Sequence, residues 1–131
     1  MHFSIKLFLR CFIIKFLILS YYFTPDFCAG SFRCQSLADS FNNNGIVDSV
    51  TILTTSPQRY GHMDNVSNSE KIGKVNIIRF NTPEHKNKFY RQVIAYSFFA
   101  FKAIKYSLNN SKDYNYILST SSRLGTAFAG F

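Results

Sequence analysis

The sequence is short of acidic side chains, glycine, proline and tryptophan. Its 131 residues include 7 Asp and Glu, 6 Gly, 3 Pro and no Trp. So little Gly and Pro excludes a collagen-like chain and a Pro/Gly-rich disordered one. The 3 cysteines cannot all pair within one chain. A disulfide scaffold is therefore not expected, and a reducing compartment is favoured.

Basic and aromatic side chains are abundant. There are 15 Lys and Arg, 15 Phe and 8 Tyr, and the formal net charge is +8. This balance favours an anionic partner, which is a nucleic acid, a membrane surface or a phosphorylated ligand. No RNP-like, zinc-finger or helix-turn-helix pattern accompanies the charge, so we expect no nucleic acid partner. No His/Cys cluster has zinc-ligand spacing, and we expect no metal and no cofactor.

Residues 1–13 are predicted to be a basic, apolar N-terminal extension that serves as a surface anchor. Lys6, Arg10 and Lys15 interrupt the apolar residues at the start of the chain too often for a membrane span. A cleaved secretory signal is the alternative. We consider it the weaker one, because only residues 16–23 form an unbroken apolar region.

Residues 14–131 predict an α/β domain with a Rossmann-like parallel sheet and flanking helices. The continuous apolar run at 15–20 is typical of a central strand that is covered on both faces. A helix that begins at Phe32, with Ser31 as its cap, and a strand at 49–54 complete a βαβ unit. The remaining expected elements are strands at 75–80 and 114–119, helices at 89–108 and 123–131, and a polar loop at 63–71.

The loop after the first strand is the first candidate site, because ligands of open α/β sheets bind outside the carboxyl ends of the strands. Ala29-Gly30-Ser31 lies where a helix begins. Small residues let a ligand approach free N–H groups that attract phosphate, and Arg33 adds positive charge in the first turn. The alternative is that Gly30 only makes a tight turn and Ser31 only caps the helix.

The loop after the second strand is the other candidate from the residues alone. Arg59, Tyr60 and His62 form a polar cluster there that can hold a sugar or a phosphate through charge, stacking and hydrogen bonds. An exposed loop with a chance histidine is an equal alternative. The sequence contains neither G-x-G-x-x-G nor G-x-x-x-x-G-K-[ST], so a dinucleotide fingerprint is not supported and a P-loop is excluded.

The helix expected at 89–108 combines a basic stripe with a broad apolar surface. Arg91, Phe98, Lys102 and Lys105 fall on one helical face, and apolar residues cover much of the rest. This pattern is typical of a helix that lies on an anionic membrane, with Arg91, Lys102 and Lys105 facing the lipid. A core helix with one solvated basic face is the alternative.

Several short motifs, in their order and spacing, resemble the N-terminal domain of family 4 glycosyltransferases, especially the bacterial ones that build O-antigen and capsule polysaccharides. The resemblance runs from about Lys15 to the end of the chain. The motifs that carry it are Tyr22-Phe23-Thr24-Pro25-Asp26, Ala29-Gly30, Arg33, Leu37-Ala38, Gly45, Val50-Thr51-Ile52-Leu53-Thr54, Pro57, Tyr60, the helix around Tyr96, and Ser119-Thr120-Ser121-Ser122.

The resemblance implies a GT-B architecture of two Rossmann-like domains and the transfer of a sugar from a nucleotide-sugar to a lipid-linked saccharide acceptor. It implies a cytoplasmic enzyme, peripheral on the inner face of the cell membrane, without a tightly bound metal. Ala29, Gly30 and Ser31, with Arg33, would approach the donor phosphates. The acceptor side would include Arg59, Tyr60, His62, Ser121 and Ser122.

The chain departs from the family pattern in two ways. The C-terminal domain, with its nucleotide pocket and paired glutamates, is missing from these residues, so we expect an incomplete N-terminal domain with half a donor site and no transferase activity alone. Cys28 stands where small residues are usual. The alternative function is a non-catalytic protein that binds a membrane surface.

Overall fold

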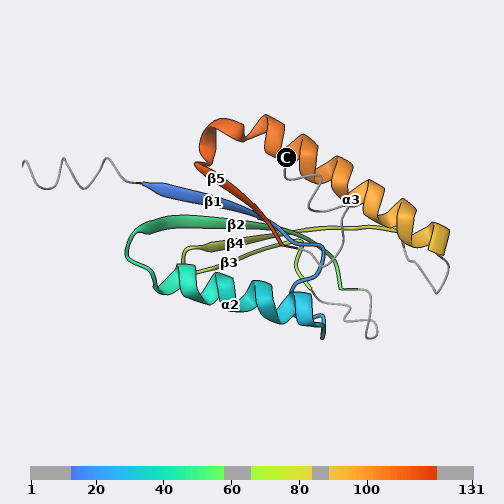
Figure 1. Ribbon diagram of the computed structural model, residues 1–131, viewed down its shortest axis with the longest axis horizontal. Coiled ribbons are helices and arrows are strands. Elements are labelled where there is room, and N and C mark those ends of the chain that lie inside the picture. The colour runs from blue at the N-terminus through green and yellow to red at the C-terminus, as the bar shows by residue number, and fades with distance from the viewer. Residues whose placement is uncertain (1–12, 58–65, 84–88, 121–131) are drawn as a thin grey trace, which may run out of the picture.

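A five-stranded sheet lies between two helices in the computed structural model, which describes residues 13–57, 66–83 and 89–120 (Figure 1). In chain order the elements are β1 (Ile14–Leu19), α2 (Ala29–Asn43), β2 (Val47–Thr55), β3 (Ser69–Ile72), β4 (Val75–Phe80), α3 (Phe89–Asn109), the 3-10 turn η1 (Ser111–Asp113) and β5 (Tyr116–Ser119). The strand order is β3-β4-β2-β1-β5.

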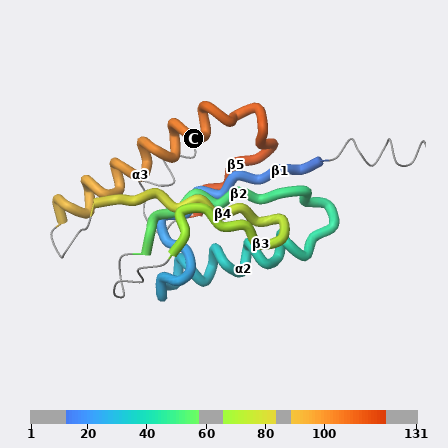
Figure 2. The backbone as a smooth tube through the Cα atoms, turned by 180° about the vertical axis from the view of Figure 1, so that it is seen from behind, coloured from blue at the N-terminus to red at the C-terminus, as the bar shows by residue number. Residues whose placement is uncertain are grey.

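The sheet is parallel except at one edge. β1 pairs in parallel with both β2 and β5, and β2 pairs in parallel with β4, whereas β3 is antiparallel to β4. Helix α2 covers one face and α3 the other, which is also seen from behind (Figure 2). The expected α/β fold with a parallel sheet and flanking helices is therefore confirmed for the described residues, except at β3, which is antiparallel.

Strand β1 lies inside the sheet, between β2 and β5, as its continuous apolar run predicts. Leu17, Ile18 and Leu19 are all buried, because helices cover both faces of the strand. Alternate side chains enter different cores: Ile18 packs toward α2, and Leu17 and Leu19 pack toward α3.

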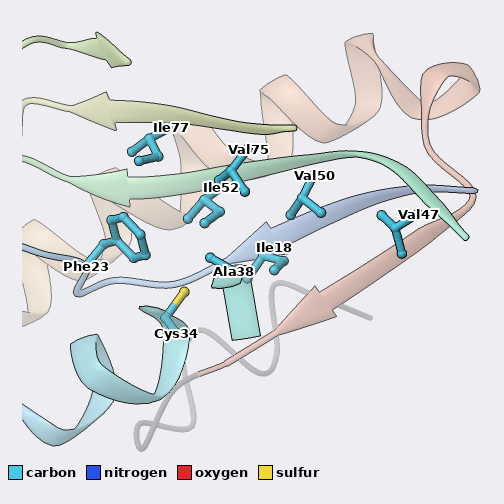
Figure 3. Packing of buried hydrophobic residues seen from close by; sticks show 9 residues of the cluster. All are labelled: Ile18, Phe23, Cys34, Ala38, Val47, Val50, Ile52, Val75 and Ile77. Atoms are coloured by element: carbon cyan, nitrogen blue, oxygen red, sulfur yellow. The ribbon is translucent and has the colours of Figure 1, made fainter. Parts of the chain in front are cut away.

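Side chains from β1, α2, β2 and β4 form the core on the α2 side of the sheet (Figure 3). Cys34 and Ala38, which are four residues apart, point from the helix toward the sheet. Phe23, from the loop after β1, closes the carboxyl end of this core. The cluster consists of Ile18, Phe23, Cys34, Ala38, Val47, Val50, Ile52, Val75 and Ile77.

Helix α3 packs on the opposite face through small residues and one large one. Ala95, Phe99 and Ala103 are its buried residues, again four apart. A tyrosine chain fixes the connection that follows the helix. The Tyr114 hydroxyl donates to Thr51 Oγ1 (3.1 Å) and lies 3.1 Å from the Tyr106 hydroxyl, which therefore donates to it.

The prediction that 63–71 is only a polar loop is wrong at its end, where β3 begins. All four residues of β3 are exposed, so neither an apolar run nor an alternation marks the strand. A two-residue turn with Gly73 at φ 59° joins β3 to β4. Backbone pairing to β4 is therefore what forms β3, and it adds a fifth strand to the four expected. The expected helix at 123–131 lies outside the described residues.

Candidate functional site: the carboxyl edge of the sheet

The strand order reverses direction at β1. The chain runs from β1 through β2 to β4 on one side and then crosses back over the sheet, through α3, to place β5 on the other side of β1. The helices before and after the reversal lie on opposite faces (Figure 1). In doubly wound sheets the crevice at such a point, outside the carboxyl ends of the strands, is the preferred ligand site. In this sheet the preferred position for a ligand is therefore at the carboxyl ends of β1 and β5.

The loop that leaves β1 is fixed to the end of β2 at one carbonyl. The Tyr21 carbonyl accepts three hydrogen bonds, from the Thr55 N–H (3.3 Å), the Thr54 hydroxyl (3.3 Å) and the Thr55 hydroxyl (2.7 Å). Both threonines are buried. Since water does not compete for these bonds, they hold the start of the loop in one position.

Arg79, at the carboxyl end of β4, holds the same loop further along. Its side chain is only 4% exposed. One Nη donates to the Thr24 carbonyl (3.1 Å), and the other donates to the Ser67 carbonyl (3.1 Å) and to Glu70 Oε2 (3.0 Å). A buried guanidinium thus joins β4, the start of β3 and the loop after β1, and it places a positive charge at this edge of the sheet.

Helix α2 begins at the carboxyl edge, and its cap differs from the expected one. The N-cap is Cys28, whose Sγ accepts a hydrogen bond from the Ser31 N–H (3.4 Å). The prediction that Ser31 caps a helix from Phe32 is therefore wrong, and the helix starts three residues earlier. Phe27 and Phe32 lie on either side of the first turn with ring centroids 6.4 Å apart, as in a hydrophobic staple.

The four candidate phosphate-binding residues share the first turns of α2. Ala29 and Arg33 are exposed, and Gly30 is half-buried. Ser31 is fully buried, and its hydroxyl has no hydrogen-bond partner among the described residues. The N–H groups of Ala29 and Gly30 belong to the first turn and so have no intrahelical acceptor. A Cβ at Gly30 would meet only Cys28 Sγ, at 4.0 Å, so neither local space nor a tight turn requires glycine here.

A buried acidic residue precedes this turn. Asp26 is 3% exposed and stands two residues before the cap. An anion near the start of a helix is favoured by the helix dipole, so an ionised Asp26 would compete with an incoming phosphate for that field. Arg33, exposed in the second turn, is a cation that can offset such a charge.

The other sequence-predicted residues fall partly outside the described part of the chain. Arg59, Tyr60 and His62 follow the end of β2, and Ser121 and Ser122 follow the end of β5. All five lie outside the described residues.

The basic residues of α3 do not share one environment. Arg91 and Lys105 are exposed, whereas Lys102 is half-buried. Its ammonium group donates to the Asn81 carbonyl (3.4 Å) and lies 4.5 Å from the centroid of the Phe98 ring. Two of the three side chains are therefore available at the surface, and Lys102 mainly joins α3 to the segment after β4.

Two further observations concern metal binding and the reactivity of the Cys34 thiol. Within the described ranges, no group of three or more His, Cys, Asp or Glu side chains is arranged to hold a metal ion. Burial raises the pKa of Cys34 to about 11, although a hydrogen bond with Ser20 lowers it somewhat, so this thiol stays protonated near neutral pH.

No family model, curated protein or solved structure matches the chain. The fold itself gives the class of protein: the chain is an α/β protein whose mostly parallel sheet is consistent with a Rossmann-like fold. Arg79 and the Tyr21 carbonyl, which hold the loop of the candidate site, were missed by sequence reasoning. Alternation along β4 offered a signal, because Arg79 shares the buried face of Val75 and Ile77.

Proposed function

We propose that the chain forms the acceptor-side domain of a GT-B glycosyltransferase. The enzyme would move a sugar from a nucleotide-sugar to a lipid-linked saccharide acceptor at the inner face of the cell membrane, in cell-surface polysaccharide synthesis. The observation that carries the proposal is the reversal of strand order at β1, beside which α2 begins at the carboxyl edge. The resemblance of the motifs along the chain supports the same assignment.

In this proposal the first turn of α2 binds the donor phosphates. The N–H groups of Ala29 and Gly30 point a positive helix end at the anion, and Arg33 offsets the negative charge of Asp26. Nothing in the fold requires glycine at 30, so the missing side chain is available for close approach of a ligand. The fixed loop before the turn keeps these donors in place without reorganisation.

The 131-residue chain is expected to bind a nucleotide-sugar without transferring its sugar. Stabilising a leaving nucleoside diphosphate needs groups that close around it from two domains, and this domain supplies one side. Turnover by the chain alone, measured with a panel of nucleotide-sugars and an undecaprenyl-linked acceptor, would contradict the half-site assignment.

The decisive experiment separates binding from stability at Gly30. We expect Gly30→Ala to weaken binding of UDP-glucose or GDP-mannose about tenfold in calorimetry, because a methyl group blocks the approach to the N–H groups. Thermal stability should not fall, since alanine is the better helix former. Gly45→Ala is the matched control, because a Cβ there meets nothing within 4 Å. Equal affinity of wild type and Gly30→Ala, or no binding by wild type, would overturn the proposal.

A further inference from the structure

The side of α3 that faces away from the sheet is mostly apolar. Five large side chains on this side repeat at helical spacing and are 42 to 71% exposed, and the exposed Ser97 lies among them. We call them the outer face of α3. They are Tyr90, Ile94, Phe101, Ile104 and Leu108.

The core does not account for this face. The helix already buries Ala95, Phe99 and Ala103 against the sheet, on the opposite side. A helix that covers a sheet normally turns polar residues outward. Large exposed apolar side chains gathered on one side of a helix mark an interaction site. None of the described elements covers this second apolar side of α3, so it is available for a partner.

All charged side chains of α3 are positive. Arg91, Lys102 and Lys105 are the charged residues of the 21-residue helix, which contains no Asp or Glu. Arg91 and Lys105 are exposed beside the outer face, while Lys102 is held at the segment after β4. The partner must therefore present a wide apolar region together with negative charge.

An anionic lipid surface meets both requirements. We propose that α3 lies flat on such a membrane, with its outer face among the acyl chains and with Arg91 and Lys105 at the phosphate headgroups. Among the described residues, no helix has the length and apolar character to cross a bilayer. A second copy of the chain fits less well, because two α3 helices placed face to face would bring only cations together.

This docking leaves the carboxyl edge open. α3 lies on one face of the sheet and α2 on the other (Figure 1), and the candidate site lies at the carboxyl ends of β1 and β5. A membrane against the outer face of α3 therefore does not cover the start of α2. The docking proposal rests on α3 alone and holds whether or not a nucleotide-sugar binds at the edge.

Co-sedimentation with lipid vesicles tests the proposal. Wild type should bind vesicles of equal parts phosphatidylcholine and phosphatidylglycerol, and bind phosphatidylcholine alone much more weakly. Phe101→Ser should lower the partition constant about tenfold, because one large inserted side chain is lost. Lys105→Ala and Arg91→Ala should each lower it about fivefold at low salt. Ile46→Ser is the matched control, because Ile46 is 63% exposed but lies outside α3.

Each variant replaces an exposed side chain, so the fold is expected to persist, and far-UV circular dichroism checks this. Equal binding of wild type and Phe101→Ser would overturn the proposal, as would equal binding to both vesicle types. Sedimentation velocity provides the remaining outcome. If wild type self-associates and Phe101→Ser is monomeric, with no difference on vesicles, the outer face joins two copies and the membrane proposal is wrong.

Discussion

Replacing Arg79 with methionine should destabilise the protein by about 2–3 kcal/mol. The guanidinium is almost fully buried and donates to the Thr24 carbonyl, the Ser67 carbonyl and Glu70. Without it, the half-buried Thr24 carbonyl loses its donor, which costs about 1–3 kcal/mol. The Glu70 carboxylate is 44% exposed, so the ion pair adds only about 0–1 kcal/mol.

Methionine keeps the volume of the aliphatic stem, so the loss reports on the polar contacts. The buried Arg79 Nε has no hydrogen-bond partner in the described part of the chain, so removing this atom recovers part of the lost stability. Arg79→Ala should cost more than Arg79→Met, since it also removes the packed stem. Urea denaturation followed by circular dichroism measures both losses.

Two controls make the reasoning refutable. Glu70→Gln should cost about 1 kcal/mol or less, and Lys71→Met, at an exposed neighbour on β3, should stay within about 0.5 kcal/mol of wild type. If Glu70→Gln costs as much as Arg79→Met, the ion pair and not the carbonyl contacts stabilises this edge. If Arg79→Met is as stable as wild type, Arg79 does not hold the loop after β1.

Three further predictions concern the turn at Gly73, the Cys34 thiol and the hydrogen-bonded tyrosines Tyr106 and Tyr114. Gly73→Ala should cost about 1–2 kcal/mol in urea denaturation, because φ is +59° and the new Cβ would lie 2.6 Å from Asn42 Oδ1; stability equal to wild type would contradict this. Burial raises the pKa of the Cys34 thiol from 9.0 to about 11, so its contribution to stability is complete below pH 9 and should fall by roughly 1.4 kcal/mol per pH unit toward pH 11. Cys34→Ala should remove that part of the slope in alkaline denaturation profiles, and an unchanged slope would refute it. Tyr114→Phe should cost about 1 kcal/mol by thermal denaturation, because its hydroxyl links Tyr106 to Thr51, and no loss would show that the chain of hydroxyls is not stabilising.

Much of the layered fold could be predicted because β1 and β2 are covered by helices on both faces. The apolar runs of β1 and β2 and the spacing of Cys34 and Ala38 in α2 are direct consequences of burial. The sequence of β3 has no apolar pattern, because its side chains are exposed and it pairs with β4 through backbone groups. Gly73, between Ile72 and Val75, was the available hairpin signal.

The candidate site was less predictable than the fold. Its position at the carboxyl edge follows from the βαβ pattern, but the reversal at β1 requires knowing that β5 pairs with β1. The sequence predicts Ser31 as the N-cap of α2, because serine is a usual cap. In the structure the N-cap is Cys28, three residues earlier. Contacts such as that between Arg79 and the Thr24 carbonyl, 55 residues apart, leave no local pattern in the chain.

Helix α3 explains why hydrophobicity alone cannot identify the buried side of a helix. Both of its sides are apolar, so a hydrophobic pattern does not distinguish the sheet from an outside partner. Side-chain size does distinguish them. Ala95 and Ala103 let the helix approach the sheet closely around Phe99, whereas the outer face carries mainly large side chains that no close backbone contact could accept. The small residues therefore mark the core, and the basic residues beside the large ones mark the side for which we propose an anionic partner.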